Sequence, residues 1–336
     1  MEGKPRKQDI EWLQRRKDSI QHIKGIEQVI ESEELVTSRF VCSLTVTEDK
    51  RIASGGVDES ISISSYDVNE KKWKRDIHKE YAHYESVTSL CPLNGNRLLS
   101  GGFYGSLKVW SLSGVELTLI KEIKGYKPVS KVIPLSKERF ASCMSMDRTV
   151  NIWKDDNTYE CISTLENDDW VSSILQLRGK EVLVSAYRGY EPSLPCGVSF
   201  WNINDYTKQH TITGYSVCWS THMIELPNNG NIALSSYYEP YPIVIIDSSS
   251  YQIVTMIQLK EYITYPSSLC VFDEHSFIYA CDGIFLQISN EDGRVLFHSK
   301  GGRFHGRFGD ILPLEGGKYF AIENGKRISI IKPCFS

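Results

Sequence analysis

The sequence predicts an all-β chain folded as a seven-bladed β-propeller that is closed by an N-terminal strand. Three observations lead to this prediction: a hairpin pattern that recurs seven times, intervals of 41 to 48 residues between the copies, and a chain end that leaves the last copy one strand short. An interval of that length is typical of one four-stranded propeller blade. The 336 residues form one domain rather than two, because a blade cannot bury its two faces without neighbours.

The clearest copy of the hairpin is NRLLSGGFYGSLKVW, residues 96–110. An apolar run leads into small residues at 100–102, the chain turns, and an alternating strand ends in Trp110. Alternation of apolar and polar residues is the pattern of a half-buried strand. Aligned on the residue that ends this second strand, the seven copies end at Ser64, Trp110, Trp153, Trp201, Ile246, Gln287 and Ile331.

The N-terminal segment differs from the rest of the chain. Residues 1–25 carry Ile10, Leu13, Ile20 and Ile23 on one helical face and end in a glycine, which predicts an amphipathic helix or extension. This helix would either pack against the propeller or serve as a handle for a partner, and the sequence leaves the two alternatives open. Residues 26–336 form the propeller domain.

The strand that closes the ring is expected at residues 26–34, IEQVIESEE. Only five residues follow the last hairpin at Ile331, and these are too few for another strand of ordinary length. The segment 26–34 should therefore be the outer strand of the seventh blade. This arrangement closes the ring and removes an exposed sheet edge.

From residue 39 onwards each repeat supplies an inner strand, the hairpin and an outer strand, with Gly, Asn, Asp and Ser at the turns. No helical pattern appears after residue 34. The inner strands are expected at 40–45, 87–92, 129–135, 171–177, 221–226, 268–272 and 310–314, and outer strands at, for example, 159–165, 251–259 and 295–299.

The composition is that of an ordinary soluble surface, with 24% charged residues and a formal net charge of −4. It favours neither direct contact with nucleic acid nor binding to an acidic membrane. No apolar run approaches the roughly 18 residues of a spanning helix, and no signal peptide is apparent. The nine cysteines show no CxxC pair, which favours reduced, buried thiols and an intracellular location, taken to be the cytoplasm.

The hairpins SGGVDES-ISIS, SGGFYGSLKVW and MDRTVNIW resemble the WD-repeat β-propeller pattern, and the resemblance covers about residues 34–333. The family's structural hydrogen-bond set joins a His between blades, a turn Asp, a Ser or Thr and the Trp. The matching positions are Asp58, His83, Trp110, Asp147, Trp153 and Trp201. No blade has the full set. Because buried polar groups need mutual partners, blades that lack one member are expected to lack the network.

Motifs of enzymes and of cofactor sites are not found. The sequence has no GxSxG, P-loop, GxGxxG or HExxH motif and no paired Cys/His spacing. The eight histidines are dispersed, and His83 is interpreted as a structural residue rather than a catalytic base. The chain is therefore expected to be non-enzymatic, with no cofactor and no metal.

Aromatic residues concentrate in the loops of one face. In a propeller that resembles this family, the loops from each outer strand to the next inner strand and the turns inside each hairpin emerge together. Twelve of the eighteen tyrosines lie in these loops. The predicted partner-binding residues are Tyr84, Phe103, Tyr104, Tyr126, Trp170, Tyr187, Arg188, Tyr190, Tyr215, Tyr237, Tyr238, Tyr241, Arg303, Phe304 and His305.

Tyr, Trp and Arg dominate hot spots of protein binding, so these loops predict a scaffold that binds a peptide or protein partner. Packing of the same aromatic residues across the blade tops is the alternative for any single position. Two other functions stay open. One is a fixed subunit of a large assembly, such as a ribonucleoprotein or cytoskeletal complex. The other is a small-ligand or enzyme propeller with its site at the channel mouth around Asp282, Arg303 and His305.

Overall fold

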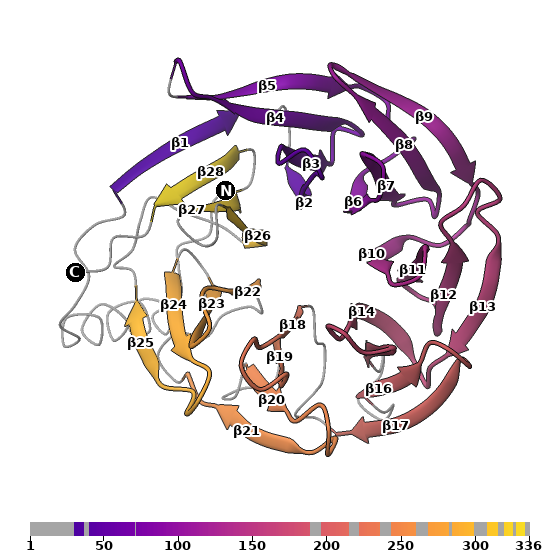
Figure 1. Ribbon diagram of the computed structural model, residues 1–336, viewed down its shortest axis with the longest axis vertical. Helices are drawn as coiled ribbons and strands as arrows, with labels where there is room; N and C mark the ends of the chain where they lie inside the picture. The colour runs from indigo at the N-terminus through magenta and orange to yellow at the C-terminus, as the bar shows by residue number, and fades with distance from the viewer. Residues whose placement is uncertain are drawn as a thin grey trace, which may run out of the picture.

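The structure is a computed structural model that describes residues 30–36, 40–70, 72–188, 196–214, 222–235, 243–259, 268–281, 284–298, 308–314, 319–324 and 327–332. Within these ranges the chain forms seven four-stranded antiparallel sheets, arranged as the blades of a ring (Figure 1). The predicted all-β, seven-bladed propeller is confirmed. The helix expected in residues 1–25 lies outside the described residues, and none of the described residues is helical.

The strands are given by blade, from the inner to the outer strand. Blade one has β2 (Val41–Val46), β3 (Ile52–Gly56), β4 (Ile61–Asp67) and β5 (Lys72–Lys79); blade two has β6 (Val87–Leu93), β7 (Arg97–Gly102), β8 (Leu107–Ser113) and β9 (Glu116–Ile123). Blade three has β10 (Val129–Leu135), β11 (Arg139–Met144), β12 (Thr149–Lys154) and β13 (Cys161–Glu166); blade four has β14 (Trp170–Gln176), β15 (Val182–Arg188), β16 (Gly197–Asn202) and β17 (Thr207–Thr213). Blade five has β18 (Met223–Glu225), β19 (Ile232–Ser235), β20 (Ile243–Ile246) and β21 (Ile253–Ile257); blade six has β22 (Leu269–Val271), β23 (Ser276–Cys281), β24 (Ile284–Ser289) and β25 (Val295–His298). Blade seven has β26 (Phe308–Leu314), β27 (Tyr319–Asn324), β28 (Arg327–Lys332) and, as its outer strand, β1 (Ile30–Val36).

The two ends of the chain meet in blade seven. Strand β1 pairs antiparallel with β28, from Ile30 opposite Lys332 to Val36 opposite Arg327. In Figure 1 the indigo β1 runs along the outer side of the yellow β28. Closure by an N-terminal strand is therefore confirmed: the described strand spans residues 30–36, which overlaps the predicted 26–34 and extends two residues beyond it, and residues 26–29 lie outside the described residues.

The repeat is visible in the register of the strands. Between the third and fourth strands the ladder shifts at the residue chosen to align the seven copies, at Ser64, Trp110, Trp153, Trp201 and Ile246. In blade six the shift falls between Gln287 and Ile288. An extra residue in one strand bends that strand and increases its twist. The same irregularity therefore bends the outer strand in six successive blades.

The hydrophobic core consists of seven clusters, one at each junction between neighbouring blades. Between blades one and two, for example, Ile61 and Ile63 pack against Leu98 and Trp110. The cluster that closes the ring joins Leu44 of blade one to Ile328 of blade seven. The other five junctions have equivalent clusters. Each blade is thus stabilised by its two neighbours.

Side chains of the inner strands also join one blade to the next. The hydroxyl oxygen of Ser43 in blade one accepts a hydrogen bond from the backbone N–H of Leu90 in blade two, at 3.1 Å. Ser89 accepts from Val132 in the same way at 3.0 Å, and Ser268 accepts from Ile311 at 3.1 Å. All three serines are buried. These bonds satisfy backbone donors that face the neighbouring blade rather than their own ladder.

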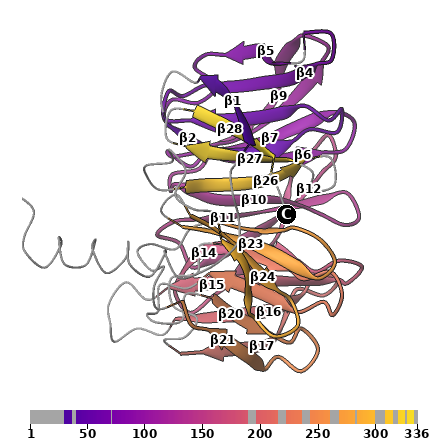
Figure 2. The same ribbon diagram turned by 90° about the vertical axis from the view of Figure 1, so that its left-hand side faces the viewer.

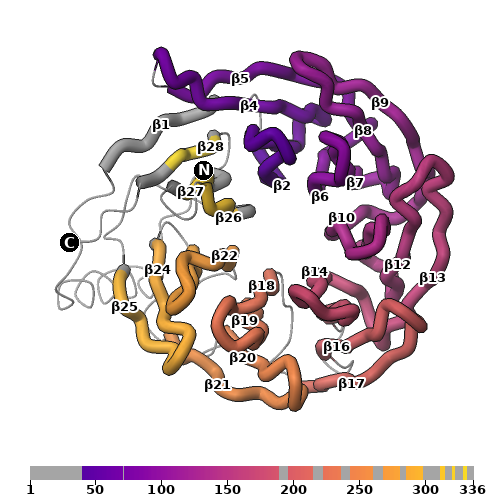
Figure 3. The backbone as a smooth tube through the Cα atoms, in the orientation of Figure 1, coloured from indigo at the N-terminus to yellow at the C-terminus, as the bar shows by residue number. Residues whose placement is uncertain are grey.

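The disc has two faces, both of which carry loops when it is viewed edge-on (Figure 2). We call one of them the top face. It carries the turns between second and third strands and the loops that enter each inner strand. The bottom face carries the remaining turns. The tube of Figure 3 shows how the inner strands β2, β6, β10, β14, β18, β22 and β26 surround the central axis.

On the bottom face a cation at or just before the second strand of a blade reaches the next blade. Arg51 donates to the backbone oxygen of Gly114 at 2.8 Å, and Lys180 donates to Ser248 at 3.1 Å. Arg97 binds Asp155 through two hydrogen bonds of 2.7 and 3.0 Å. This bidentate pair is the strong geometry for guanidinium and carboxylate, and it links blades two and three.

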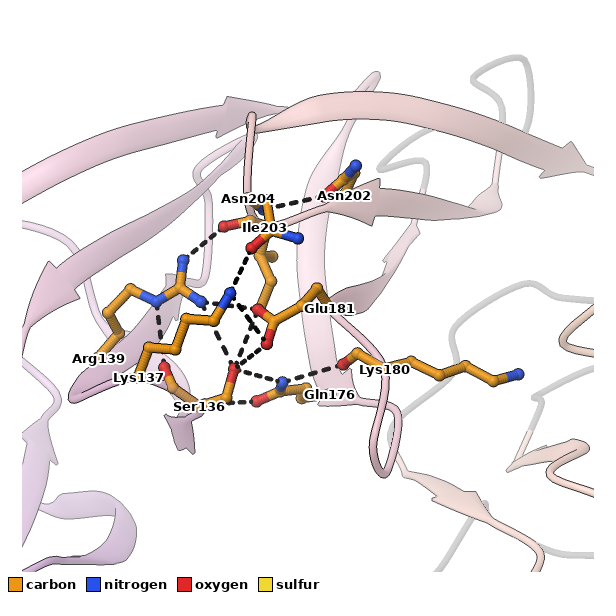
Figure 4. A network of polar contacts seen from close by, with 9 residues as sticks. All are labelled: Ser136, Lys137, Arg139, Gln176, Lys180, Glu181, Asn202, Ile203 and Asn204. Atoms are coloured by element: carbon orange, nitrogen blue, oxygen red, sulfur yellow. Dashed lines mark hydrogen bonds and ion pairs between the residues drawn. The ribbon is translucent and has the colours of Figure 1, made fainter.

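Figure 4 shows the equivalent contact between blades three and four, where the network is largest. Arg139 of blade three is buried and donates to the backbone oxygen of Ile203 and, at 2.9 Å, to the carboxylate of Glu181. The hydroxyl of Ser136 donates to the same carboxylate at 3.0 Å and accepts from the amide of Gln176 at 3.1 Å. A buried guanidinium is stable only when its donors are paired, so these residues hold the two blades in one register.

The small residues before each hairpin turn make room for the next blade. A Cβ at Gly101 would lie 2.4 Å from Cγ1 of Val129, and one at Gly55 would lie 2.5 Å from Cγ1 of Val87. The two valines are the first residues of the following inner strands, β10 and β6. Glycine is therefore required here by the close approach of two blades.

Replacing Gly101 by alanine is expected to lower the free energy of unfolding by about 1 to 3 kcal/mol, the usual cost of overpacking a core. The measurement is urea denaturation of the full chain. A double-mutant cycle with Val129→Ala supplies the control, because it removes the closest contact, with Cγ1 at 2.4 Å, and leaves only the contact with Cβ of residue 129 at 2.8 Å. The double variant should be more stable than the sum of the two single changes predicts. Simple additivity would contradict the proposed contact.

The cysteines agree only in part with the expected reduced thiols. Cys91, Cys143, Cys161 and Cys270 form no disulfide bond. Burial raises the pKa of the Cys143 thiol to about 12, and it raises the pKa of Cys91 and Cys270 as well. The expectation is wrong at Cys196, which is disulfide-bonded. Cys196 has no other cysteine close in the sequence, so spacing carries no signal of such a bond.

Candidate protein-binding surface

Four exposed aromatic side chains gather on the top face of blades two and three. They are Tyr84 in the loop that enters β6, Phe103 and Tyr104 in the turn after β7, and Tyr126 in the loop that enters β10. Tyr84 is 84% exposed and Tyr126 is 95% exposed. The ring centroid of Tyr104 lies 5.8 Å from that of Tyr84 and 5.9 Å from that of Phe103. We call these four residues the aromatic platform.

A buried histidine holds the first two parts of the platform together. His83 precedes Tyr84, is 2% exposed and is hydrogen-bonded through Nδ1 to Ser106 at 2.8 Å and through Nε2 to Ser100 at 2.7 Å. Ser106 lies two residues after Tyr104. The indole N–H of Trp110 donates to Ser100 at 2.8 Å. The loop that carries Tyr84 is thereby tied to the turn that carries Phe103 and Tyr104.

Backbone contacts reinforce this tie. The backbone N–H of Phe103 donates to the carbonyl oxygen of Ser86 at 3.0 Å, and that of His83 donates to the carbonyl oxygen of Glu59 in blade one at 3.2 Å. At Gly102 a Cβ would lie 2.3 Å from Nδ1 of His83. The absence of a side chain at Gly102 therefore leaves space for the imidazole between the two loops. Burial, and to a smaller extent the charge of Lys108, lowers the pKa of His83 to about 3, so the ring is neutral near pH 7.

Two glycines bring Tyr126 to the same site. Gly105 has φ of +85°, and a Cβ there would lie 2.5 Å from the carbonyl oxygen of Lys127 and 2.7 Å from the backbone nitrogen of Tyr126. A Cβ at Gly125 would lie 2.3 Å from the carbonyl oxygen of Gly105. The turn of blade two and the loop into blade three are thus in backbone contact, which only glycine permits. The loops that carry the platform are therefore held in place by hydrogen bonds and close backbone contacts.

The structural Trp positions form their hydrogen bonds in three blades. Trp153 donates to Ser142 at 2.9 Å in blade three, and Trp201 donates to Ser185 at 2.9 Å in blade four, as Trp110 does in blade two. The expectation that an incomplete blade lacks the network is therefore wrong. The Trp–Ser bond joins two strands of one hairpin, so it forms without the loop residues.

Other residues replace the missing members of the set. Blade two has Tyr104 instead of a turn Asp, and Ser106 bonds the histidine directly. Blade four has Asn167 four residues before the first inner-strand valine, as His83 is in blade two, and its side-chain oxygen accepts from Ser185 at 2.6 Å. The turn Asp of blade one, Asp58, accepts from the hydroxyl of Ser60 at 2.7 Å. That of blade three, Asp147, pairs with Lys127 at 3.1 Å.

The predicted binding residues of blade four behave differently from the platform. Trp170 is half-buried, and the guanidinium of Arg188 lies 6.0 Å from its ring centroid. Tyr187 is completely buried, and its hydroxyl donates to Asp168 at 3.0 Å. The assignment of Tyr187 to the binding surface therefore needs correction. Tyr187 stands where Gly102 stands in blade two and fills space beside the smaller Asn167, because Gly197 leaves room for its ring.

The remaining predicted residues lie outside the described residues: Tyr190, Tyr215, Tyr237, Tyr238, Tyr241, Arg303, Phe304 and His305. The channel-mouth alternative, which also involves Asp282, falls outside them too. Within the part that is described, no group of three or more His, Cys, Asp or Glu residues could hold a metal ion. The same part contains no helix long and apolar enough to cross a membrane.

Sequence reasoning missed exposed apolar residues of the top face, among them Phe40, Val57 and Met146. Phe40 is expected to begin an inner strand but precedes β2 and is 56% exposed, and Met146 lies exposed in the turn of blade three. Tyr81, in the same loop as Tyr84, is exposed as well. Their place in top-face loops is the signal that could have found them. They extend the apolar surface on both sides of the platform.

Seven antiparallel blades around one axis, closed by strands from the two ends of the chain, define a β-propeller. In comparisons with known proteins, the family described as WD domain, G-beta repeat matches residues 75–111. That stretch includes the outer part of blade one and the first three strands of blade two. Together with the seven-bladed ring, this match supports a WD-repeat propeller. Propellers of this family generally act as scaffolds that bind proteins or peptides. No curated protein matches the chain.

Proposed function

We propose that the chain is a non-enzymatic scaffold that holds a peptide or protein partner on its top face, centred on the aromatic platform. The observation that supports this most strongly is the exposure of four aromatic side chains on loops held by buried hydrogen bonds and by glycine contacts. A contiguous exposed apolar patch on a soluble protein usually marks an interaction site. Loops held in place before binding lose little conformational freedom when the partner arrives. We further propose that this interaction takes place in the cytoplasm.

The test is affinity capture of the tagged full chain from its native cells at two salt concentrations. The variant Tyr84→Ser, Tyr104→Ser, Tyr126→Ser is expected to lose the partners that the wild type captures. Its melting temperature should change little, because exposed substitutions away from buried contacts usually alter stability by about 0.5 kcal/mol or less each. A fluorescent fusion of the full chain, imaged in the same cells, tests the location.

A matched control removes apolar surface from the opposite side of the disc. Tyr66, Val68 and Val115 are exposed at or near the bottom-face turns of blades one and two. Their triple replacement by serine should leave capture unchanged. If the platform variant captures the same proteins as the wild type, the top-face proposal is wrong.

A further inference from the structure

The loops on the Tyr84 side of the platform carry more acidic than basic residues. The turn of blade one contains Asp58 and Glu59, and the loop with Tyr84 contains Glu80 and Glu85; neither segment, 57–60 or 80–86, contains a Lys or Arg. Asp58 bonds Ser60 and Glu80 lies 3.9 Å from His78. The carboxylates of Glu59 and Glu85 have no ion-pair partner among the described residues. Glu85 directly follows Tyr84, and the carbonyl of Glu59 binds the backbone of His83.

The aromatic rings of the platform, like the carboxylates of Glu59 and Glu85, have no cationic partner among the described residues. Among the described tryptophans, three have a cation of the chain over the ring: Lys108 lies 5.9 Å from the centroid of Trp110, Arg188 lies 6.0 Å from Trp170, and Lys208 lies 4.9 Å from Trp201. In the part of the chain that the structure describes, no Lys or Arg has this position over a ring of the platform. The faces of Tyr84 and Tyr104 are thus available to a cation from outside.

We propose, building on the function proposed above, that the partner presents a basic side chain to the platform, arginine being the best fit. Its guanidinium would lie on the rings of Tyr84 and Tyr104 and pair with Glu85 and Glu59. Aromatic faces attract cations through the ring quadrupole. Arginine combines this stacking with paired hydrogen bonds to a carboxylate. Charge complementarity of this kind orients a partner and excludes acidic segments from the same place.

An acidic partner would have to use the other side of the platform. Lys124 and Lys127 flank Tyr126, but Lys127 is already paired with Asp147 at 3.1 Å. On the side that carries Tyr84, Lys79 adjoins Glu80, and Lys108 donates to the backbone oxygen of Ala82 at 2.8 Å and lies 3.6 Å from Glu122. The acidic residues Asp58, Glu59, Glu80 and Glu85 outnumber these two lysines, so the excess charge on this side is negative. This asymmetry decides in favour of a basic partner segment.

The test uses two synthetic peptides and the full chain. One is acetyl-Gly-Arg-Gly-Arg-Gly-amide, and the other has citrulline, a neutral group of the same shape, at both arginine positions. Binding is measured by saturation-transfer NMR and calorimetry at low and high salt. The arginine peptide should bind at least fivefold more tightly than the citrulline peptide. Tyr84→Ser should weaken it about two- to fivefold, the range of one exposed cation–π contact.

The double variant Glu59→Gln, Glu85→Gln should weaken arginine binding and reduce its salt dependence. The double variant Glu116→Gln, Glu138→Gln is the control, because it removes the same number of charges at bottom-face turns. Equal affinity for the two peptides would overturn the inference. So would an affinity for the arginine peptide that is unchanged in the Glu59→Gln, Glu85→Gln variant. If platform substitution abolishes partner capture while the arginine peptide does not bind, the proposed function stands and only the basic partner is wrong. Unchanged capture would refute the two proposals together.

Discussion

Deleting residues 1–36 is expected to lower the melting temperature of the chain by about 10 °C or more. The deletion removes β1, which covers β28 over positions 30–36, and no other strand can take its place in blade seven. Each backbone hydrogen bond contributes roughly 0.5 to 1.5 kcal/mol net, so the loss of the strand's ladder amounts to several kcal/mol. The exposed edge of β28 should also cause association, because unpaired strands bind other strands.

Deleting residues 1–29 is the matched control, since it leaves β1 in place. The two truncated chains are compared with the full chain by differential scanning fluorimetry and by size-exclusion chromatography. We expect the shorter deletion to melt close to the full chain. Addition of a synthetic peptide of residues 28–38 should raise the melting temperature of the longer deletion, by binding the folded state only. If the two truncated chains melt alike, the closing strand is not what holds the ring.

The ring could be predicted from the sequence because each of its features is periodic or local. The seven copies of the hairpin predicted the number of blades, and the pairing of β1 with β28 confirms the predicted closure. The limits of that strand could not be predicted, because residues 26–34 alternate in a way that suits several registers. Pairing with β28 decides the matter, since Val36 lies opposite Arg327 at one end and Ile30 opposite Lys332 at the other.

The candidate surface could be predicted as a face but not residue by residue. Chain direction alone places the loops of Tyr84 and Tyr187 on the same side of the disc. Whether a side chain points outward depends on the space behind it, which the sequence does not show. Tyr84 lies exposed in the loop that enters β6, whereas Tyr187 lies buried in β15, where blade two has Gly102. The ring of Tyr187 occupies space that Gly197 leaves open, and the order of the strands does not reveal that space.

The second large effect concerns pH and the same histidine. His83 is neutral in the folded chain because burial lowers its pKa to about 3, whereas an exposed histidine has a pKa near 6.5. The unfolded chain therefore binds a proton below pH 6.5 that the folded chain does not bind. This contribution to stability is complete above pH 6.5 and is lost as the pH falls towards 3. At pH 5 the loss is about 2 kcal/mol.

The measurement compares wild type with His83→Asn by urea denaturation between pH 7.5 and pH 5. Asparagine is the suitable replacement, because Asn167 has the same place in blade four and bonds the serine that holds Trp201. The other described histidines, at 78, 210, 222, 275 and 298, are kept in the two proteins, so their titration cancels in the difference. We expect wild type to lose about 2 kcal/mol more than the variant over this range. If the free energies of unfolding of the two proteins change with pH in parallel, His83 is not held neutral in the folded chain. In that case the proposed role of His83 in holding the platform would also be wrong.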